Sequence, residues 1–192
     1  MDLQRVSLKI LTDAPVTLNL DPFLVIFSRW RTDANHPAQW VDLADYAHMP
    51  RGPGIILIGH RCNFSFDLGT AAPGIQYLSK QGLEGSSEDR LRTVLRDCFA
   101  LTRSLLGESE FPSSVHLLTG ALELAFNDRL ETPHTAETDR ALQPAVTKVL
   151  DRLYGPGKYS VKPEPDAGRR YGFTIAAPED PGLEVLTARL AQ

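Results

Sequence analysis

The chain has 192 residues, of which 42% are hydrophobic and 23% are charged, and its formal net charge is −4. This composition excludes an intrinsically disordered chain, because such chains combine a large charge excess with few aromatic residues. It also argues against nucleic-acid binding, which depends on neutralising phosphates, since the longest run of basic residues is the pair Arg169–Arg170. The length fits one large domain or two small ones.

No targeting or membrane signal is evident. The N-terminal sequence MDLQRVSLKIL is polar and lacks the apolar run of a signal peptide. Every apolar run is also far shorter than the ~20 residues that a transmembrane helix requires. We therefore expect a cytoplasmic protein without a membrane partner. Its two cysteines, Cys62 and Cys98, have no metal-binding or redox spacing, and we expect buried, unreactive thiols.

The first quarter of the chain predicts a strand followed by a helix. Residues 5–12 alternate apolar and polar side chains, which is typical of a half-buried strand. Asp21 followed by Pro22 suggests an N-cap and a proline at the first helical position. Bulky side chains then recur at helical spacing and predict one aromatic helix face, made of Phe23, Ile26, Phe27 and Trp30.

Four further strands and a long helix follow. Segments 40–49, 54–60, 63–69 and 74–80 alternate in polarity and are separated by PRGPG and TAAPG, so we predict an antiparallel meander. Ser86 and Asp89 then resemble a capping box, and Gly107 is expected at the helix C-terminus. The apolar face predicted for this helix consists of Leu91, Val94, Leu95, Cys98, Phe99, Thr102, Leu105 and Leu106.

The second half repeats this order of elements. Residues 115–130 predict a strand that ends near Asn127, and residues 136–154 predict a helix capped by Thr135. Pro144 should kink or split this helix, because proline lacks the backbone donor of a helix interior. A hairpin of segments 158–165 and 170–178 and a short helix after Pro181 complete the chain.

The sequence therefore predicts an α+β fold with antiparallel strands, helices on one face of the sheet, and the order β-α-ββββ-α-β-α-ββ-α. We expect a single globular domain over residues 1–192, which can be divided into two halves, 1–110 and 111–192, with a related order of elements. The halves share no residue-level repeat that can be aligned.

The first candidate site lies in the predicted meander. If the turn at residues 50–54 closes the hairpin symmetrically, His60 pairs with Ala44, and Tyr46, His48 and His60 share one face of the sheet. Such a group could bind an anion, transfer a proton or share a metal. Arg61 and Asn63 follow directly and add a guanidinium fork and an amide. Solvent-facing histidines without a function are the alternative. A Cys62 nucleophile can also be drawn, but no third orienting group is evident.

The second candidate site is the polar segment Asn127, Asp128 and Arg129, which separates an apolar strand from a helix. These residues, with His134, could line an anion-binding or subunit-contact surface. An Asx turn, in which a side chain bonds the nearby backbone, is the simpler interpretation.

The segments RGPGIILIGH and FNDRL resemble bacterial conserved proteins of unassigned function, and the resemblance implies a bacterial, cytosolic setting without an activity. The nucleotide-binding and protease motifs G-x-G-x-x-G, G-x-x-x-x-G-K-[ST], H-E-x-x-H and G-x-S-x-G are absent, so neither an enzyme class, a metal site nor a cofactor is indicated.

Two hypotheses of function remain. The first is a non-enzymatic binding or assembly protein that acts as a homo-oligomer, most simply a homodimer, through exposed strand edges or aromatic helix faces. The alternative is a small-molecule enzyme or ligand-binding protein, in which the His/Tyr/Arg group and residues 127–129 close a cleft around a small anionic ligand.

Overall fold

The computed structural model of the protein describes residues 3–49, 52–69 and 72–191. Parts of the turns predicted at 50–54 and 70–74 therefore lie outside the described residues. The elements are β1 (Val6–Thr12), α1 (Asp21–Thr32), β2 (Trp40–Asp45), β3 (Ile55–Gly59), β4 (Cys62–Asp67), β5 (Gly74–Ser79), α2 (Ser87–Leu106), β6 (Leu117–Phe126), α3 (Ala136–Tyr154), β7 (Ser160–Pro163), β8 (Gly172–Ala176) and α4 (Leu183–Ala191). This order confirms the predicted α+β class.

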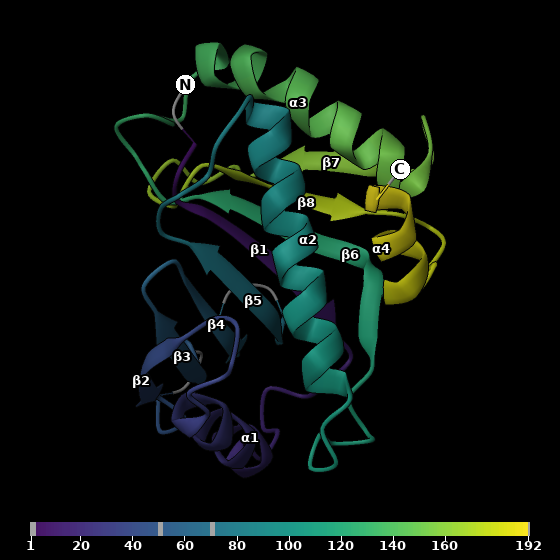
Figure 1. Ribbon diagram of the computed structural model, residues 1–192. Helices are drawn as coiled ribbons and strands as arrows, with labels where there is room; N and C mark the ends of the chain where they lie inside the picture. Colours follow the sequence, from purple (N-terminus) through teal and green to yellow (C-terminus); the bar gives the residue numbers. More distant parts are fainter. Residues whose placement is uncertain (1–2, 50–51, 70–71, 192) are drawn as a thin grey trace.

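The described strands form one antiparallel sheet of eight strands in the order β2-β3-β4-β5-β1-β6-β8-β7 (Figure 1). The first strand of each half lies at the centre, where β1 pairs with β6 and Leu8 lies opposite Leu124. In each half the last strand returns to pair with the first, so β5 flanks β1 and β8 flanks β6. Side chains from both halves contribute to one hydrophobic core cluster.

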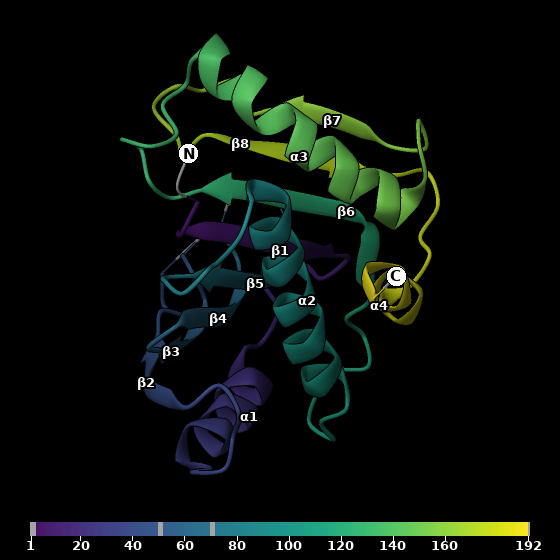
Figure 2. The same cartoon turned by 45° about the horizontal axis from the view of Figure 1, so that its top comes forward.

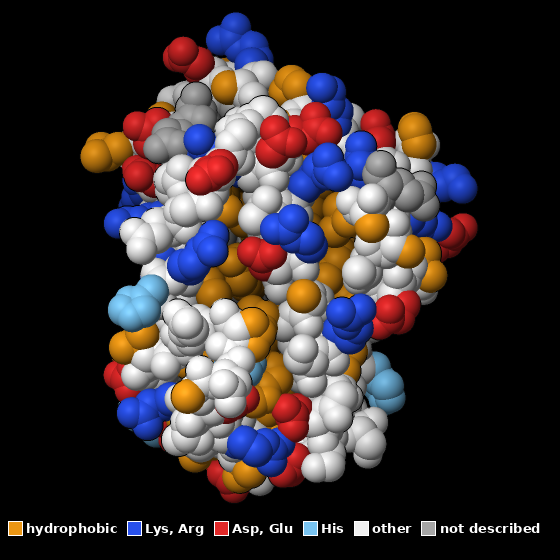
Figure 3. Space-filling view, in the orientation of Figure 1, with side chains coloured by type: hydrophobic (Ala, Val, Ile, Leu, Met, Phe, Trp, Pro, Cys, Tyr) orange, Lys and Arg blue, Asp and Glu red, His pale blue; other side chains and the backbone are white. Residues whose placement is uncertain are grey.

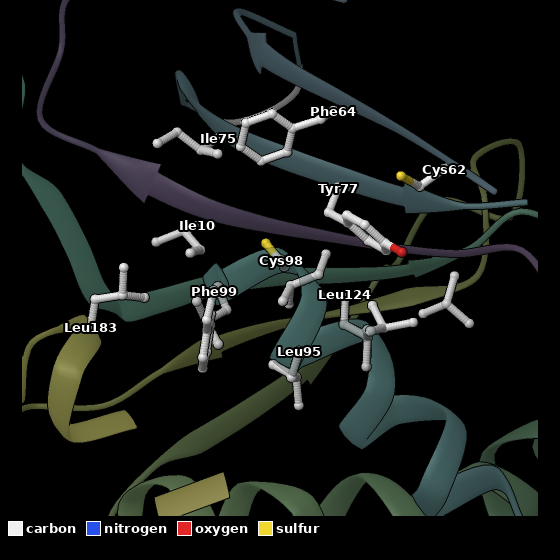
Figure 4. Close-up of a cluster of buried hydrophobic side chains, with 14 of the residues drawn as sticks. Ile10, Cys62, Phe64, Ile75, Tyr77, Leu95, Cys98, Phe99, Leu124 and Leu183 are labelled. Carbon is white, nitrogen blue, oxygen red and sulfur yellow. The ribbon is translucent and has the colours of Figure 1, made fainter. Parts of the chain in front are cut away.

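The described helices pack on one face of this sheet (Figures 1 and 2). Side chains on alternate strand positions point to that face and are buried beneath the helices, among them Ile10, Ile75 and Phe64 (Figure 4). At the β2 end of the sheet, α1 places Phe23 against Phe66 with ring centroids 4.1 Å apart. No helix within the described ranges is both long and apolar enough to cross a lipid bilayer. The opposite face of the sheet has no helix of the described chain upon it.

The aromatic face of α1 is buried as predicted, but the predicted N-cap is wrong. Asp21 is the first residue of the helix, and the Asn19 side chain accepts a hydrogen bond from the Asp21 backbone N–H at 3.0 Å. The N-cap position is occupied by Leu20, which has no side chain that could cap the helix, so Asp21, the residue with capping chemistry, lies one position further into the helix than predicted.

The capping box of α2 is confirmed. The Ser86 hydroxyl accepts a hydrogen bond from the Asp89 N–H at 3.2 Å, and the Asp89 carboxylate accepts one from the Ser86 N–H at 3.0 Å. Gly107 follows the helix with φ −80°, so it does not use the left-handed conformation expected of a closing glycine. Leu106 is 38% exposed and does not belong to the buried face.

The expected division of α3 at Pro144 is wrong, because the helix continues from Ala136 to Tyr154. Pro144 lies on the exposed side of the helix. Thr135 caps the helix as predicted, since its side chain accepts a hydrogen bond from the Thr138 N–H at 3.2 Å.

Candidate functional site

The first predicted cluster does not form. Ala44 pairs with Ile56 and not with His60, because Asp45 already pairs with Ile55 and the segment that joins the two strands is longer than assumed. Tyr46 and His48 lie in the segment that follows β2, where the Tyr46 N–H donates to the Gly54 carbonyl at 2.8 Å. The turn is therefore longer than the symmetric one assumed. His60 lies in the turn between β3 and β4, at the other end of β3, so the three side chains do not share a face of the sheet.

Two neighbours of His60 point to opposite faces of the sheet. Arg61 lines a cavity of about 450 Å³ with His60, Cys62, Tyr77 and Asp97 on the side of the helices, and Figure 3 shows the hollowed surface beside α2. Asn63 pairs with Ile58 and Leu78, one residue further along β4, and alternation turns its side chain to the helix-free face. Its Oδ1 atom is buried without a hydrogen-bond partner among the described residues.

The two thiols are unsuited to nucleophilic chemistry. Burial raises the pKa of Cys62 to about 11, although a hydrogen bond with Tyr77 opposes this shift. Burial likewise raises the pKa of Cys98 to about 12, and this side chain lies on the buried face of α2 (Figure 4). A nucleophilic cysteine requires a depressed pKa, which neither residue has. The arrangement therefore favours packing over catalysis.

The second predicted segment is divided in the structure. Asp128 forms the Asx turn, since its Oδ1 atom accepts hydrogen bonds from the N–H groups of Leu130 and Glu131 at 3.1 and 3.3 Å. Asn127 and Arg129 instead face the loop between β7 and β8. His134 also contacts this loop, with Nε2 3.0 Å from the Arg169 carbonyl oxygen.

A cavity of about 700 Å³ lies on the helix-free face of the sheet. One of its walls, here called the loop wall, consists of residues 127 and 129 and of residues 168–170 from the loop between β7 and β8. Its floor consists of Ser7, Ala125 and Gly172, which lie side by side on β1, β6 and β8. These small side chains leave a hollow between longer neighbours. Gly172 also allows close strand contact, because a Cβ atom there would lie 2.3 Å from the Leu124 carbonyl oxygen.

A row of longer polar side chains forms the second wall. Gln76, Lys9, Glu123 and Thr174 lie in register on β5, β1, β6 and β8 and line the cavity. Lys9 is 1% exposed, and its Nζ atom lies 2.6 Å from Asp67 Oδ2 and donates to the Gly69 carbonyl at 2.7 Å. The Lys9 charge is therefore balanced within the protein.

The loop wall carries three arginines in different electrostatic settings. Arg169 lies 3.4 Å from a Glu164 carboxylate oxygen, so its charge is partly balanced. Arg129 Nη2 donates to the Gly168 carbonyl at 2.8 Å, and Arg170 Nη1 donates to the Asn127 side-chain oxygen. Both of these acceptors are neutral. Among the described residues, neither Arg129 nor Arg170 has a carboxylate within 4.0 Å, so neither guanidinium forms an ion pair, although Glu123 and Glu164 also line the cavity.

The two predicted groups do not close a common cleft. His60, Arg61 and Cys62 line the cavity beside α2, whereas Asn127 and Arg129 line the cavity on the opposite face. Across the described part of the chain, no three His, Cys, Asp or Glu side chains gather in a way that would hold a metal ion.

No family model, curated protein or solved structure gives a significant match to this chain. The resemblance to bacterial proteins thus stays a prediction.

Sequence reasoning identified Asn127 and Arg129 but missed most of this cavity. It treated Arg170 only as the first residue of the predicted strand segment 170–178, and it assigned Lys9, Gln76 and Thr174 only to strands. These residues meet because β1 pairs with β5 and β6, and β6 pairs with β8, which joins segments from both halves. The alternation of each strand was the available signal, since it places these side chains away from the core.

Proposed function

We propose that the protein binds a small anionic ligand in the cavity on the helix-free face of its sheet. The observation that carries this proposal is the pair Arg129 and Arg170, whose guanidinium groups line one cavity and bond only neutral acceptors. Guanidinium groups bind carboxylates and phosphates through paired, charge-assisted hydrogen bonds. The volume of about 700 Å³ is within the usual range of ligand sites.

The positive charge of this site is local. The chain as a whole has a net charge of −4, so general attraction of anions is not expected. Lys9 and Arg169 each have a carboxylate partner, which leaves Arg129 and Arg170 as the groups that attract an anion. They come from two separate loops, and a bound anion would join these loops.

The strand edges favour this proposal over assembly by strand pairing. Edge strand β7 is only four residues long and contains Lys162 and Pro163. The other edge strand, β2, has a register shift between Trp40 and Asp42 and ends at Asp45. Short length, proline, charge and bulges all oppose edge-to-edge pairing. The homo-oligomer expected from the sequence stays a prediction.

The proposal is tested by calorimetric titration of the full chain with inorganic phosphate. We expect Arg129→Gln and Arg170→Gln each to weaken binding about tenfold or more, because a hydrogen bond to a charged group contributes about 1.5–3 kcal/mol. Arg140→Gln is the matched control. Arg140 is also exposed and also donates to a backbone carbonyl, that of Ala136, but it lies on α3 outside the cavity.

Both cavity arginines are exposed, so the substitutions should leave the unfolding midpoint within a few degrees of that of the unmodified chain. A double variant that is folded and still binds phosphate with the original affinity would show that the proposed site is wrong.

A further inference from the structure

We infer that the ligand of this cavity is a phosphate monoester of a small polyhydroxylated compound, such as a sugar phosphate. This inference rests on the proposed function and narrows it. It follows from three features of the cavity. These are the two arginine charges without an ion-pair partner, the polar side chains on the second wall, and the lack of an aromatic or apolar surface in the described lining.

The charge on the loop wall matches a phosphate monoester better than a carboxylate. Arg129 and Arg170 supply two positive charges from two loops, and each guanidinium presents a planar fork of donors. A phosphate monoester carries close to two negative charges at neutral pH and has three peripheral oxygens, which can serve two forks. A carboxylate has one charge and two oxygens, so it would satisfy only one of the arginines.

The second wall, formed by the row of polar strand residues, is suited to binding the hydroxyl groups of a ligand. Gln76 and Thr174 line the cavity, and among the described residues neither forms a side-chain hydrogen bond. The Gln76 amide both donates and accepts, and so does the Thr174 hydroxyl, as a polyol requires. The buried Ser7 on the floor adds a second hydroxyl. A free phosphate ion would leave the Gln76 and Thr174 side chains of this wall without a hydrogen bond to the ligand.

The lining also argues against aromatic and acyl anions. Leu124 and Phe173 belong to the hydrophobic core, and strand alternation turns their side chains toward the helices. They contribute to the cavity mainly through their backbone. The described lining therefore provides neither an aromatic surface on which a nucleobase could stack nor an apolar surface for a hydrocarbon chain.

The test is a calorimetric comparison on the full chain. The ligands are glycerol 3-phosphate, ribose 5-phosphate and glucose 6-phosphate, their unphosphorylated parents, inorganic phosphate and malonate. We expect at least one phosphate ester to bind ten or more times as tightly as inorganic phosphate, with no measurable binding of its parent polyol. The near-isosteric changes Gln76→Met and Thr174→Val should remove this gain, whereas Arg140→Gln, which lies outside the cavity, should keep it.

Three results would overturn the inference. If inorganic phosphate binds as tightly as every ester, or if malonate binds as tightly as the best ester, the ligand class is wrong while anion binding at Arg129 and Arg170 stands. If neither inorganic phosphate nor any ester binds, the proposed function fails as well.

Discussion

Lys9 and Asp67 form an ion pair across an intervening strand, on the face of the sheet that the described helices do not cover. Lys9 lies on β1 and Asp67 on β4, with β5 between them. Gly74 of β5 makes the contact possible, because a Cβ atom at this position would lie 2.9 Å from Lys9 Cε. The lysine side chain thus passes over a glycine to reach its carboxylate, and the pair helps to fix the floor beside the proposed site.

Loss of one partner of this pair should be strongly destabilising. Lys9→Met leaves the buried Asp67 carboxylate without its closest cation, and breaking a buried pair in this way costs about 3–5 kcal/mol. We expect a loss of this size in the free energy of unfolding measured with urea. The double variant Lys9→Met/Asp67→Leu should recover much of the loss, because it leaves no buried charge from the pair. Equal stability of Lys9→Met and the unmodified protein would mean that the pair is not buried.

The ion pair between Arg29 and Glu110 should make the stability of the fold sensitive to acid. Hydrogen bonds from the Arg29 guanidinium, at 2.7 Å, lower the pKa of Glu110 from 4.5 to about 2. Because the folded-state pKa is the lower one, this carboxylate stabilises the fold above about pH 4.5 and loses that contribution as the pH falls toward 2.

Glu110→Gln should therefore reduce stability at pH 7 and reduce the further loss between pH 4.5 and 2. Thermal unfolding measured across this range checks the expectation, with the exposed Glu131→Gln as a control, since Glu131 forms no ion pair with the described residues. An acid profile that is the same for Glu110→Gln and the unmodified chain would contradict it.

Both thiols should be unreactive in the native protein. Cys62 is 5% exposed and Cys98 is fully buried, and burial raises the pKa of both. Reaction with a thiol reagent at pH 7.5 should be negligible in the folded chain and should titrate two thiols in denaturant. Rapid modification of Cys62 without unfolding would restore the nucleophile hypothesis.

Pro144 offers a gain in stability. It occupies an exposed interior position of α3, where proline is about 3 kcal/mol less favourable than alanine. The greater flexibility of the unfolded chain offsets about 1 kcal/mol of this difference. Pro144→Ala should therefore raise the free energy of unfolding by about 2 kcal/mol, measured by urea unfolding. A lower stability of this variant would show that the proline ring makes a contact that α3 needs.

The sequence predicted local structure better than it predicted the site. The helical spacing of Phe23 and Trp30 and the capping box at Ser86 are signals within a few residues of one another, and both are confirmed. The pairing of His60 with Ala44 was wrong because it depended on the length of a turn, which the alternation of the strands does not fix.

The candidate site required information that no single segment contains. Arg129 and Arg170 belong to loops of different elements and meet only because β6 pairs with β8. Likewise, Lys9 and Gln76 were recognisable as polar positions of strands, but their common row depends on β1 lying beside β5. Non-local pairing of strands is not encoded in local periodicity, and it determines which side chains share the cavity.

The most direct test of the central claim is an NMR titration of the full, isotopically labelled chain with inorganic phosphate. Our account predicts that the backbone amide signals which move most belong to residues 127–129 and 168–172, on both sides of the cavity. Movement confined to residues 60–62, beside α2, or no movement at saturating phosphate would contradict it.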